Sequence, residues 1–550
     1  MSSSSQPQHH NEVTDPAADE GDMTPTLKKR EVAASFLFRN VLDDPRKVQV
    51  ALFRRSGAVR TYQHKLAPIS GSVEKDDANA LATAFREIKE ETTLGPESID
   101  LLREGKPYSF VDESIGRQWT IHPFAFILKS SAEEGDGQGG EGSGIVIDWE
   151  HEGWDYEGWD WYDPLLFGGV PRLLDSLRRV WPAIDLGARA GSTLTVGLSR
   201  LQTDHERGAR QLAALAVSYL TGVFVEGNCS MDDGWWARVR MAAWHLWKNG
   251  RESMGAAIVS ALVTVLSRIE NEALKPGGTV FERSNRVSAV MDEWREQRDS
   301  IISKVQASFV DLVRDRVLSE GPKKKKKKIL KVLTLSSSST ISSCLLQAAT
   351  ALDVTLDLRI LESRPLCEGV TMASKLLSDA EHEKRVNITL YSDASAALAS
   401  EDVDMVLLGA DRISSAGDVS NKTGSLPAVL SAKHVSPSSR VVVLSEVDKI
   451  AGPGNASDHA AEENDAIELT RGWEGTVKGA DDVLAASYST EAARSGDDSP
   501  RVKVKNIYFE WVPARLIDAY VTDEGVWSSD DIRKRSDWVG TEIDRFFGDL

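Results

Sequence analysis

The sequence predicts a mixed α/β protein made of three successive parts: an α/β part, a helical bundle and a part built on a parallel sheet. A chain of 550 residues is too long for one ordinary core. Between residues 166 and 320, apolar residues recur at three- and four-residue spacing, which indicates packed helices. After residue 328, short apolar strands alternate with helical stretches, a pattern typical of a parallel sheet with helices on both faces.

The amino-acid composition argues against some classes of protein and some types of binding surface. Hydrophobic residues make up 41% of the chain and charged residues 27%, as in globular proteins. The net charge of −19 argues against a general nucleic-acid-binding surface, but local pockets for small anions remain open. An odd number of cysteines (Cys229, Cys344, Cys367) argues against a disulfide framework. We therefore expect a reducing, cytoplasmic location.

Three segments are expected to lack regular structure: a tail, an insertion and a loop. Residues 1–28 are rich in Ser, His and Asp without an apolar core, so we expect a disordered tail rather than a secretory signal. Ser130–Gly144 reads as a flexible insertion. The lysine run 323–328 is either a nuclear-import signal or, the favoured reading, a solvated loop. The sequence has no run of about 18 apolar residues, so no membrane span is expected.

The first part is assigned to residues 29–168. We expect strands at Glu31–Arg39, Val48–Arg54 and Trp119–Leu128, and a helix at Ala80–Leu94.

The second part, residues 169–322, comprises a linker and the bundle, and the third spans residues 323–550. The strongest helical periodicity lies at Leu212–Leu220, Val239–Leu246, Ala256–Leu266 and Val287–Val313. Strands of the third part are expected at Ile329–Leu335, Asp357–Leu361, Asn387–Tyr391, Met405–Leu408 and Arg440–Leu444.

The expected helix at Ala80–Leu94 carries an acidic cluster. Glu87 precedes Glu90 and Glu91 by three and four residues, so the three carboxylates share one helical face. Crowded anions destabilise a helix unless a cation compensates them, and carboxylate oxygens suit Mg²⁺ or Mn²⁺. The alternative is an ordinary solvated acidic helix.

The upstream loop and the flanking strands favour the metal site. The segment resembles the Nudix box, G-x5-E-x7-R-E-U-x-E-E-x-G-U, where U is a bulky aliphatic residue. It departs from the box at Asp77, which stands for the first glutamate, at one extra residue before Arg86, and at Thr93, which replaces a glycine. Matching positions are Gly71, Arg86, Glu87, Ile88, Glu90, Glu91 and Leu94.

The resemblance implies an α/β/α sandwich that hydrolyses a nucleoside diphosphate linked to another moiety. Glu87, Glu90 and Glu91 would hold the metal. The Trp-rich stretch from Trp149 to Trp161 is expected to close the core of this part. Within it, Glu150 or Glu152 is a candidate further ligand, and the sequence does not choose between them.

The rest of the chain contains separated groups suited to phosphate. Asp411 follows the strand Met405–Leu408, which would place it at the carboxyl edge of a parallel sheet, where ligands bind. Asn421 and Lys422 follow in a glycine-rich loop and offer an amide and a charge. An Asp411–Arg412 pair at a strand end is the alternative. Further candidates are Arg207, Gly208, Ala209, Arg251 and Arg364.

Together these residues resemble the family that unites methylthioribose-1-phosphate isomerase, ribose-1,5-bisphosphate isomerase and the α, β and δ subunits of initiation factor two-B. The resemblance spans about residues 200–525 and implies a helical subdomain, a Rossmann-like subdomain and a homodimer. It implies a catalytic role for Asp411. The residues it implies to bind sugar phosphate are Arg207, Gly208, Ala209, Arg251, Asn421 and Lys422.

One departure bears on catalysis. The isomerases carry a cysteine where this chain has Ser336, and a hydroxyl ionises far less readily than a thiol. Cys344 and Cys367 are expected to be small buried residues rather than replacements.

The leading hypothesis is therefore a Nudix hydrolase fused to a domain that binds a phosphorylated sugar or nucleotide. The alternatives are an aldose–ketose isomerase and a non-enzymatic scaffold related to translation initiation.

Overall fold

The computed structural model describes most of the chain in two compact units, Met1–Leu177 and Arg178–Leu550, here the N-terminal unit and the C-terminal unit. The tail, almost all of the insertion Ser130–Gly144, the lysine run, Cys229 and Trp159–Trp161 lie outside the described residues. The described residues are 27–41, 44–129, 144–157, 169–204, 207–226, 234–273, 275, 279–317, 329–378, 385–454, 463–488 and 502–550.

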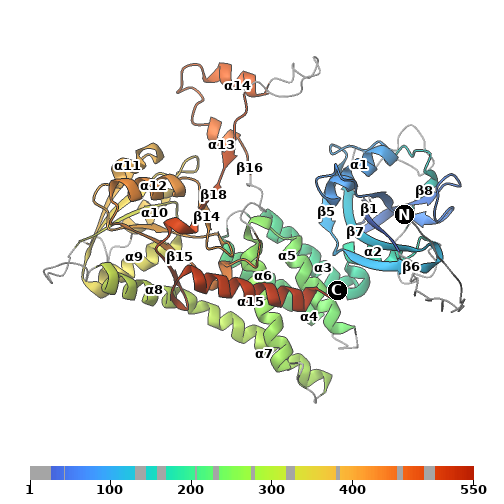
Figure 1. Cartoon of the computed structure of the whole chain (residues 1–550), viewed down its shortest axis with the longest axis horizontal. Helices are drawn as coiled ribbons and strands as arrows, with labels where there is room; N and C mark the ends of the chain where they lie inside the picture. Colours follow the sequence, from blue (N-terminus) through green and yellow to red (C-terminus); the bar gives the residue numbers. More distant parts are fainter. Residues whose placement is uncertain are drawn as a thin grey trace, which may run out of the picture. The chain divides into compact units, whose positions relative to one another are not determined.

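The N-terminal unit is built on one mixed sheet (Figure 1). Strand β1 (Lys28–Val41) runs antiparallel to β2 (Asp44–Arg55) and β4 (Ile69–Ser72), and parallel to β7 (Arg117–Leu128). The three predicted strands of this part are thus confirmed within a few residues. Sequence periodicity missed the shorter strands, which are β3 (Leu66–Ala67), β5 (Ile99–Glu104), β6 (Tyr108–Asp112) and β8 (His151–Glu157).

Helix α1 (Ala80–Thr92) packs on one face of this sheet, where Ile88 lies in a core with Leu37 and Phe126. The Asn79 side chain caps its first turn by accepting a hydrogen bond from the Ala82 N–H. The helix ends at Thr93, whose φ of 62° is left-handed. A glycine adopts that conformation without strain, so Thr93 keeps the turn of the resembled box at a cost of about 1–3 kcal/mol.

The C-terminal unit begins with the predicted helical bundle, and all of its helices except the last, α8 (Ile301–Leu312), share one large apolar core. The expected stretch Val287–Val313 is divided at Ser300, where α7 ends and α8 begins. The helices are α3 (Ala183–Thr203), α4 (Ala209–Glu226), α5 (Trp235–Lys248), α6 (Gly255–Arg268), α7 (Val280–Asp299) and α8 (Ile301–Leu312).

Within the described part of the chain, one stretch, Glu252–Asn271, is long and apolar enough to span a membrane by length and composition. Most of that stretch (72%) is buried inside the protein, and it contains α6, whose Ala257, Ile258 and Leu262 lie in the bundle core. Its apolar character is therefore explained by packing against neighbouring helices.

A seven-stranded sheet follows, in the order β11-β10-β9-β12-β15-β19-β20. All pairs are parallel except the last, which is antiparallel. The five predicted strands are confirmed, and β19 and β20 add two further strands at one edge of the sheet. The strands are β9 (Ile329–Leu335), β10 (Thr355–Leu361), β11 (Val386–Tyr391), β12 (Met405–Leu408), β15 (Arg440–Leu444), β19 (Ala519–Thr522) and β20 (Gly525–Trp527).

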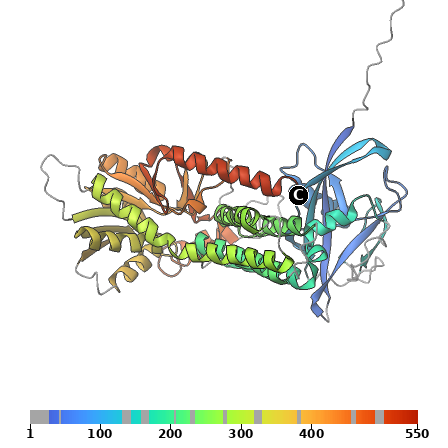
Figure 2. The same cartoon turned by 90° about the horizontal axis from the view of Figure 1, so that it is seen from below.

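Side chains alternate between two cores, one on each face of this sheet. Helices α8, α9 (Ser339–Leu352) and α10 (Glu368–Leu377) cover one face. Helices α11 (Ala396–Ala399), α12 (Ser425–Val435) and α15 (Ser529–Phe547) cover the other. Figure 2 shows α15 continuing along the bundle, where Phe546 and Phe547 enter its core.

A small sheet of β13 (Arg412–Ile413), β14 (Val419–Lys422) and β18 (Phe509–Val512) adjoins the large sheet. Between β15 and β18 the chain forms an excursion, which stands away from the sheet in Figure 1. It contains β16 (Glu463–Asn464), α13 (Ile467–Thr470), α14 (Ala480–Tyr488) and β17 (Asn506–Ile507).

Candidate functional sites

The acidic helix of the N-terminal unit meets the sheet at Gly71. A Cβ atom on Gly71 would lie 1.8 Å from Cδ and from Oε1 of Glu87. A side chain at that position would have to displace the Glu87 carboxylate, so glycine lets the carboxylate approach β4 closely. The first glycine of the resembled box therefore has a direct steric reason here.

Arg86 orients the carboxylates around it. Its Nε and Nη2 donate to the two oxygens of Asp77 at 3.1 and 2.9 Å, and its Nη1 donates to Glu87 Oε1 at 2.7 Å. The same Nη1 lies 3.4 Å from Glu90 Oε2. These bonds with Arg86 hold the pKa of Asp77 below its ordinary value. Asp77, whose role the sequence left open, thus anchors the arginine at the start of the helix.

The three glutamates occupy different environments. The Glu90 side chain is 60% exposed, whereas that of Glu91 is 5% exposed and Glu87 lies between them. Glu91 Oε2 lies 2.5 Å from Nε2 of the buried His151. Burial, followed by the charges of Glu87 and Glu150, raises the pKa of Glu91 well above its ordinary value. His151 was not predicted, because its strand position gives no sign of proximity to α1.

The structure distinguishes Glu150 from Glu152. Burial raises the pKa of both Glu87 and Glu91, and the charge of Glu150 adds to it, so Glu150 lies near the acidic helix. Glu152 instead lies at His64, with both of its oxygens 3.0 Å from Nδ1 of that residue. Of these two glutamates Glu150 is therefore the one near the cluster, and Asp148 also adjoins it through a hydrogen bond from its backbone N–H to Glu91 O.

These carboxylates suit a hard divalent cation by chemistry, because all their donors are oxygens and their like charges repel. In the geometry described, Arg86 and His151 already bond to them. Among the residues that the structure describes, no three acidic, histidine or cysteine side chains converge as a ready metal site. A cation would have to draw Glu87, Glu91 and Glu150 together and compete with Arg86.

The C-terminal unit contains a polar cavity of about 370 Å³ at the carboxyl edge of its large sheet. The N-terminal turn of α9, the loop after β12 and the start of α4 surround it. Five predicted residues line it: Gly208, Ala209, Asp411, Asn421 and Lys422. Ser336 lies there as well. The predicted placement of Asp411 at the sheet edge agrees with this geometry.

Asp411 lies among charged groups in this cavity. Its backbone N–H donates to Ser420 O, which fixes it at the start of the small sheet. Burial raises the pKa of Asp411, and the charges of Lys449 and Lys422 oppose that rise. Lys449 also donates to Ala410 O at 2.6 Å. A buried carboxyl group with a raised pKa is suited to exchanging a proton with a bound ligand.

Glu368 connects two cavity residues and was not predicted. Ser336 Oγ donates to Glu368 Oε2 at 3.0 Å, and Lys422 Nζ lies 3.3 Å from Glu368 Oε1. The charge of Glu368 also raises the pKa of Asp411. The position of the missing thiol is thus occupied by a hydroxyl that is bonded to a carboxylate.

Three predicted arginines do not line the cavity. Arg207 pairs with Asp204, and Arg251 donates to Asp204 O at 3.1 Å. The charge of Arg251 still reaches Asp411 and lowers its pKa. Arg364 lies away from the cavity, with its Nη2 2.9 Å from the position of a Cβ on Gly472. The sequence placed Arg364 among the residues suited to phosphate, but its side chain lies at Gly472 of the excursion.

The two described cysteines are free thiols outside the cavity lining. Cys344 is fully buried, and burial raises its pKa to about 12, as expected for a small core residue. The expectation for Cys367 was wrong, since it is only partly buried. Its Sγ faces Pro365 O at the start of α10.

Comparisons with known proteins match both units. The family model described as Initiation factor 2 subunit family matches residues 248–529, more than half of the chain, and the model described as NUDIX domain matches residues 32–169. The methylthioribose-1-phosphate isomerase of Rhodopirellula baltica is 34% identical over 181 residues, 32% of this chain and 43% of that protein. The one of Heliobacterium modesticaldum is 26% identical over 271 residues, 45% and 69% respectively.

The chain thus aligns with less than half the length of the Rhodopirellula relative. Among solved structures, the translation initiation factor eIF-2B of Pyrococcus horikoshii is similar with a TM-score of 0.41 and 17% identity. That similarity covers 60% of this chain and 96% of the other.

Proposed function

This chain belongs to the initiation factor 2 subunit family and carries a NUDIX domain, and from that premise we propose that its N-terminal unit is a metal-dependent hydrolase. Its substrate is a nucleoside diphosphate linked to another moiety. The observation that carries the proposal is the close approach of the Glu87 carboxylate to Gly71. An ordinary solvated acidic helix would point its carboxylates into water, whereas here one of them lies against the sheet.

The residues that would hold Mg²⁺ or Mn²⁺ are Glu87, Glu90 and Glu91, and Glu150 is a further candidate. Such a cation supplies an activated water and neutralises charge on the phosphate. Arg86 keeps the Glu87 carboxylate turned toward β4. His151 excludes water from one side of Glu91 and can exchange a proton with its Oε2.

The test is hydrolysis of a panel of nucleotide sugars and dinucleotides with Mg²⁺, Mn²⁺ or EDTA. We expect metal-dependent release of a nucleoside phosphate from at least one substrate. Glu87→Gln should abolish it, while Glu113→Gln, on an exposed turn of the same unit, should not. Equal hydrolysis in EDTA would contradict the proposal.

For the C-terminal cavity we propose binding of a phosphorylated sugar or nucleotide. Lys422 and Asn421 would contact the phosphate, with Gly208 and Ala209 as neighbouring backbone. The names of the relatives favour the isomerase alternative for this unit. In that case Asp411 is the proton-transferring carboxyl group, and the Ser336–Glu368 pair stands where the family has its thiol.

Proton exchange at the second carbon of the sugar separates binding from isomerisation. The substitution Ser336→Cys restores the family's thiol with a nearly identical side-chain shape. If the serine limits the reaction, exchange should rise in Ser336→Cys and vanish when Asp411→Asn is added. If both the parent protein and Ser336→Cys bind the sugar phosphate without proton exchange, the unit is a binding domain or a scaffold related to translation initiation.

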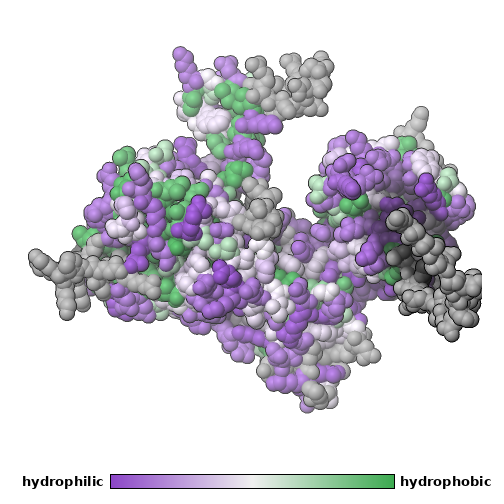
Figure 3. Space-filling model, in the orientation of Figure 1, coloured by the Kyte–Doolittle hydropathy of each residue, from purple (hydrophilic) through white to green (hydrophobic). Residues whose placement is uncertain are grey.

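We also propose a homodimer through the C-terminal unit. Figure 3 shows apolar surface over its sheet-containing part. Leu398 of α11 and Leu430 of α12, two helices on the same face of the sheet, are exposed. A cytoplasmic location remains part of the proposal. Sedimentation of the full chain tests the dimer, and Leu398→Glu should shift it toward the monomer.

A further inference from the structure

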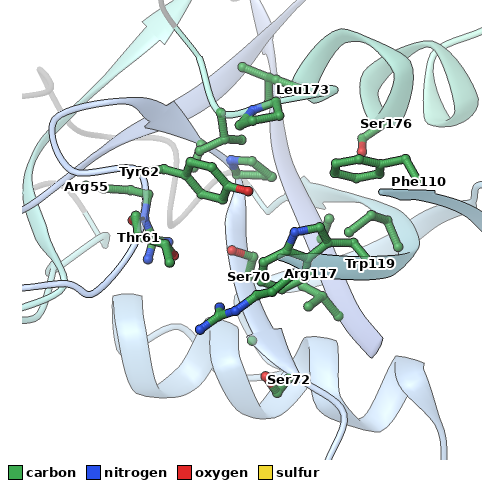
Figure 4. A pocket seen from close by; sticks show the side chains of 18 of the residues that line it. Arg55, Thr61, Tyr62, Ser70, Ser72, Phe110, Arg117, Trp119, Leu173 and Ser176 are labelled. Atoms are coloured by element: carbon green, nitrogen blue, oxygen red, sulfur yellow. Dashed lines mark hydrogen bonds between the residues drawn. The ribbon is translucent and has the colours of Figure 1, made fainter. Parts of the chain in front are cut away.

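The N-terminal unit also contains a cavity, of about 230 Å³, which no sequence motif indicated (Figure 4). Val32 and Ala34 of β1 line it, whereas Ala33 between them faces the core under α1. Because side chains alternate along a strand, the cavity lies on the face of β1 opposite that core. The start of α2 (Leu173–Val180) closes it with Leu173 and Ser176.

Aromatic side chains form the walls of this cavity. The rings of Tyr62 and Trp119 lie 6.5 Å apart at 46°, and the rings of Tyr108 and Phe110 are stacked with centroids 6.1 Å apart. Figure 4 shows Tyr62, Phe110 and Trp119 turned toward the same space.

Hydrogen bonds to neighbouring elements hold two of these rings. Tyr62 Oη donates to Asp112 Oδ2 at 2.6 Å. Tyr108 Oη lies 2.8 Å from Ser176 Oγ. The walls are therefore fixed before a ligand arrives, which lowers the entropic cost of binding.

The charged groups of the cavity are all positive. Arg55 and Arg117 line it, and no aspartate or glutamate is among its described lining residues. The guanidinium of Arg117 lies 5.3 Å from the Trp119 ring centroid. In Figure 4 it extends from Trp119 toward the side of the cavity where α1 lies. Such a pair of arginines suits the charges of a diphosphate.

Two residues connect this cavity to the acidic helix. Gly71 lines the cavity and is also where Glu87 crosses β4. Arg55 lines the cavity and pairs across β2 and β8 with His151, whose Nε2 lies 2.5 Å from Glu91 Oε2. The aromatic space and the carboxylates are thus two ends of one site.

We infer that this cavity binds the nucleobase of the substrate against Tyr62 and Trp119, with Arg55 and Arg117 directing the attached diphosphate toward Glu87 and Glu91. The inference rests on the proposed hydrolase and names the end of the substrate that is recognised. A planar base matches aromatic walls.

The experiment measures binding to the full-length protein by calorimetry in EDTA, so that no hydrolysis is needed. The probes are ADP, GDP, CDP and UDP, together with ribose 5-diphosphate, which lacks only the base. Stacking predicts that at least one nucleotide binds about tenfold more tightly than ribose 5-diphosphate. Tyr62→Leu and Trp119→Leu should each reduce that preference to under about threefold.

Matched variants separate the ring from its surroundings. Tyr62→Phe keeps the ring and loses the hydroxyl together with its bond to Asp112, so the base preference should persist. Val111→Ala alters an exposed neighbour of Phe110 on the same strand and should change nothing. Should Trp119→Leu unfold the unit, Tyr62→Leu in the loop after β2 still carries the test. Repeating the titrations with Lys422→Ala shows whether the C-terminal cavity contributes to the measured binding.

The outcomes distinguish this inference from the proposed function. Equal binding of nucleotides and ribose 5-diphosphate, or a base preference that survives both leucine variants, overturns the inference even if the panel is hydrolysed. A base preference lost in both variants supports it, even in a protein that hydrolyses nothing.

Discussion

The Glu87 carboxylate occupies the space that a side chain on Gly71 would need: the position of a Gly71 Cβ lies 1.8 Å from Cδ and Oε1 of Glu87. Gly71 has no positive φ that would demand glycine. Its role is therefore close approach, and the contact couples a strand residue to the geometry of the acidic helix.

Gly71→Ala tests that coupling. The new methyl group should displace the end of a flexible Glu87 side chain, so the unit should stay folded. Hydrolysis should fall at least about tenfold, because a misplaced carboxylate loses its alignment. Gly153→Ala is the matched control, since a Cβ there meets nothing within 4 Å. Steady-state kinetics and thermal melting of both variants give the answer, and undiminished activity in Gly71→Ala would dissociate the contact from catalysis.

Glu90→Gln addresses the exposed member of the cluster. Burial and, to a smaller extent, the charge of Glu90 raise the pKa of Glu87, so the two carboxylates lie close enough to repel each other. We expect magnesium-dependent hydrolysis to fall by about two orders of magnitude, as for loss of a metal-binding charge. The variant should remain as stable as the parent, because it loses repulsion as well as its contact with Arg86. Full activity in a folded protein would remove Glu90 from the metal site.

Two fragments test where the first folded unit ends. The boundary predicted at residue 168 stays a prediction, but Leu173 and Leu177 are buried in the region that follows it. Residues 27–177 should therefore be soluble and melt at a higher temperature than residues 27–168. The shorter fragment also loses Ser176, which bonds to Tyr108. Identical melting temperatures and nucleotide binding would show that the added segment is dispensable.

Lys422→Ala tests the C-terminal cavity. Loss of its charge should weaken binding of a pentose phosphate about tenfold, the range of a charge-assisted hydrogen bond. Lys433→Ala, on the same unit but paired with Asp518 outside the cavity, should leave affinity unchanged. Calorimetry of both variants decides, and equal loss in both would point to a nonspecific charge effect.

Asp411 should make the stability of the C-terminal unit depend on pH. Burial raises its pKa above the ordinary 3.8, so the folded unit binds this proton more tightly than the unfolded chain does. Asp411 therefore contributes to the free energy of unfolding at low pH, and this contribution is lost as the pH rises through the pKa of Asp411 in the folded protein. Asp411→Asn should remove that loss. Unfolding of both proteins between about pH 4 and pH 7 should show a growing advantage for the variant.

Local sequence patterns determined much of this fold. Apolar alternation and three- to four-residue spacing identified β1, β2, β7 and α1, and the five predicted strands of the parallel sheet, because each pattern depends only on neighbours along the chain. The spacing of Glu87, Glu90 and Glu91 and the position of Asp411 after β12 were readable for the same reason. Short strands such as β3 and β20 carry too few residues to show a pattern.

Only the tertiary structure decided which distant groups meet. It brings Glu150 rather than Glu152 to the acidic helix, pairs His151 with Glu91, and joins Ser336 to Glu368. It also turns Arg364 away from the cavity that Asn421 and Lys422 line. These contacts depend on the order of the strands and on the paths of the loops. They join residues that are far apart in the sequence, and such pairs produce no periodic pattern along the chain.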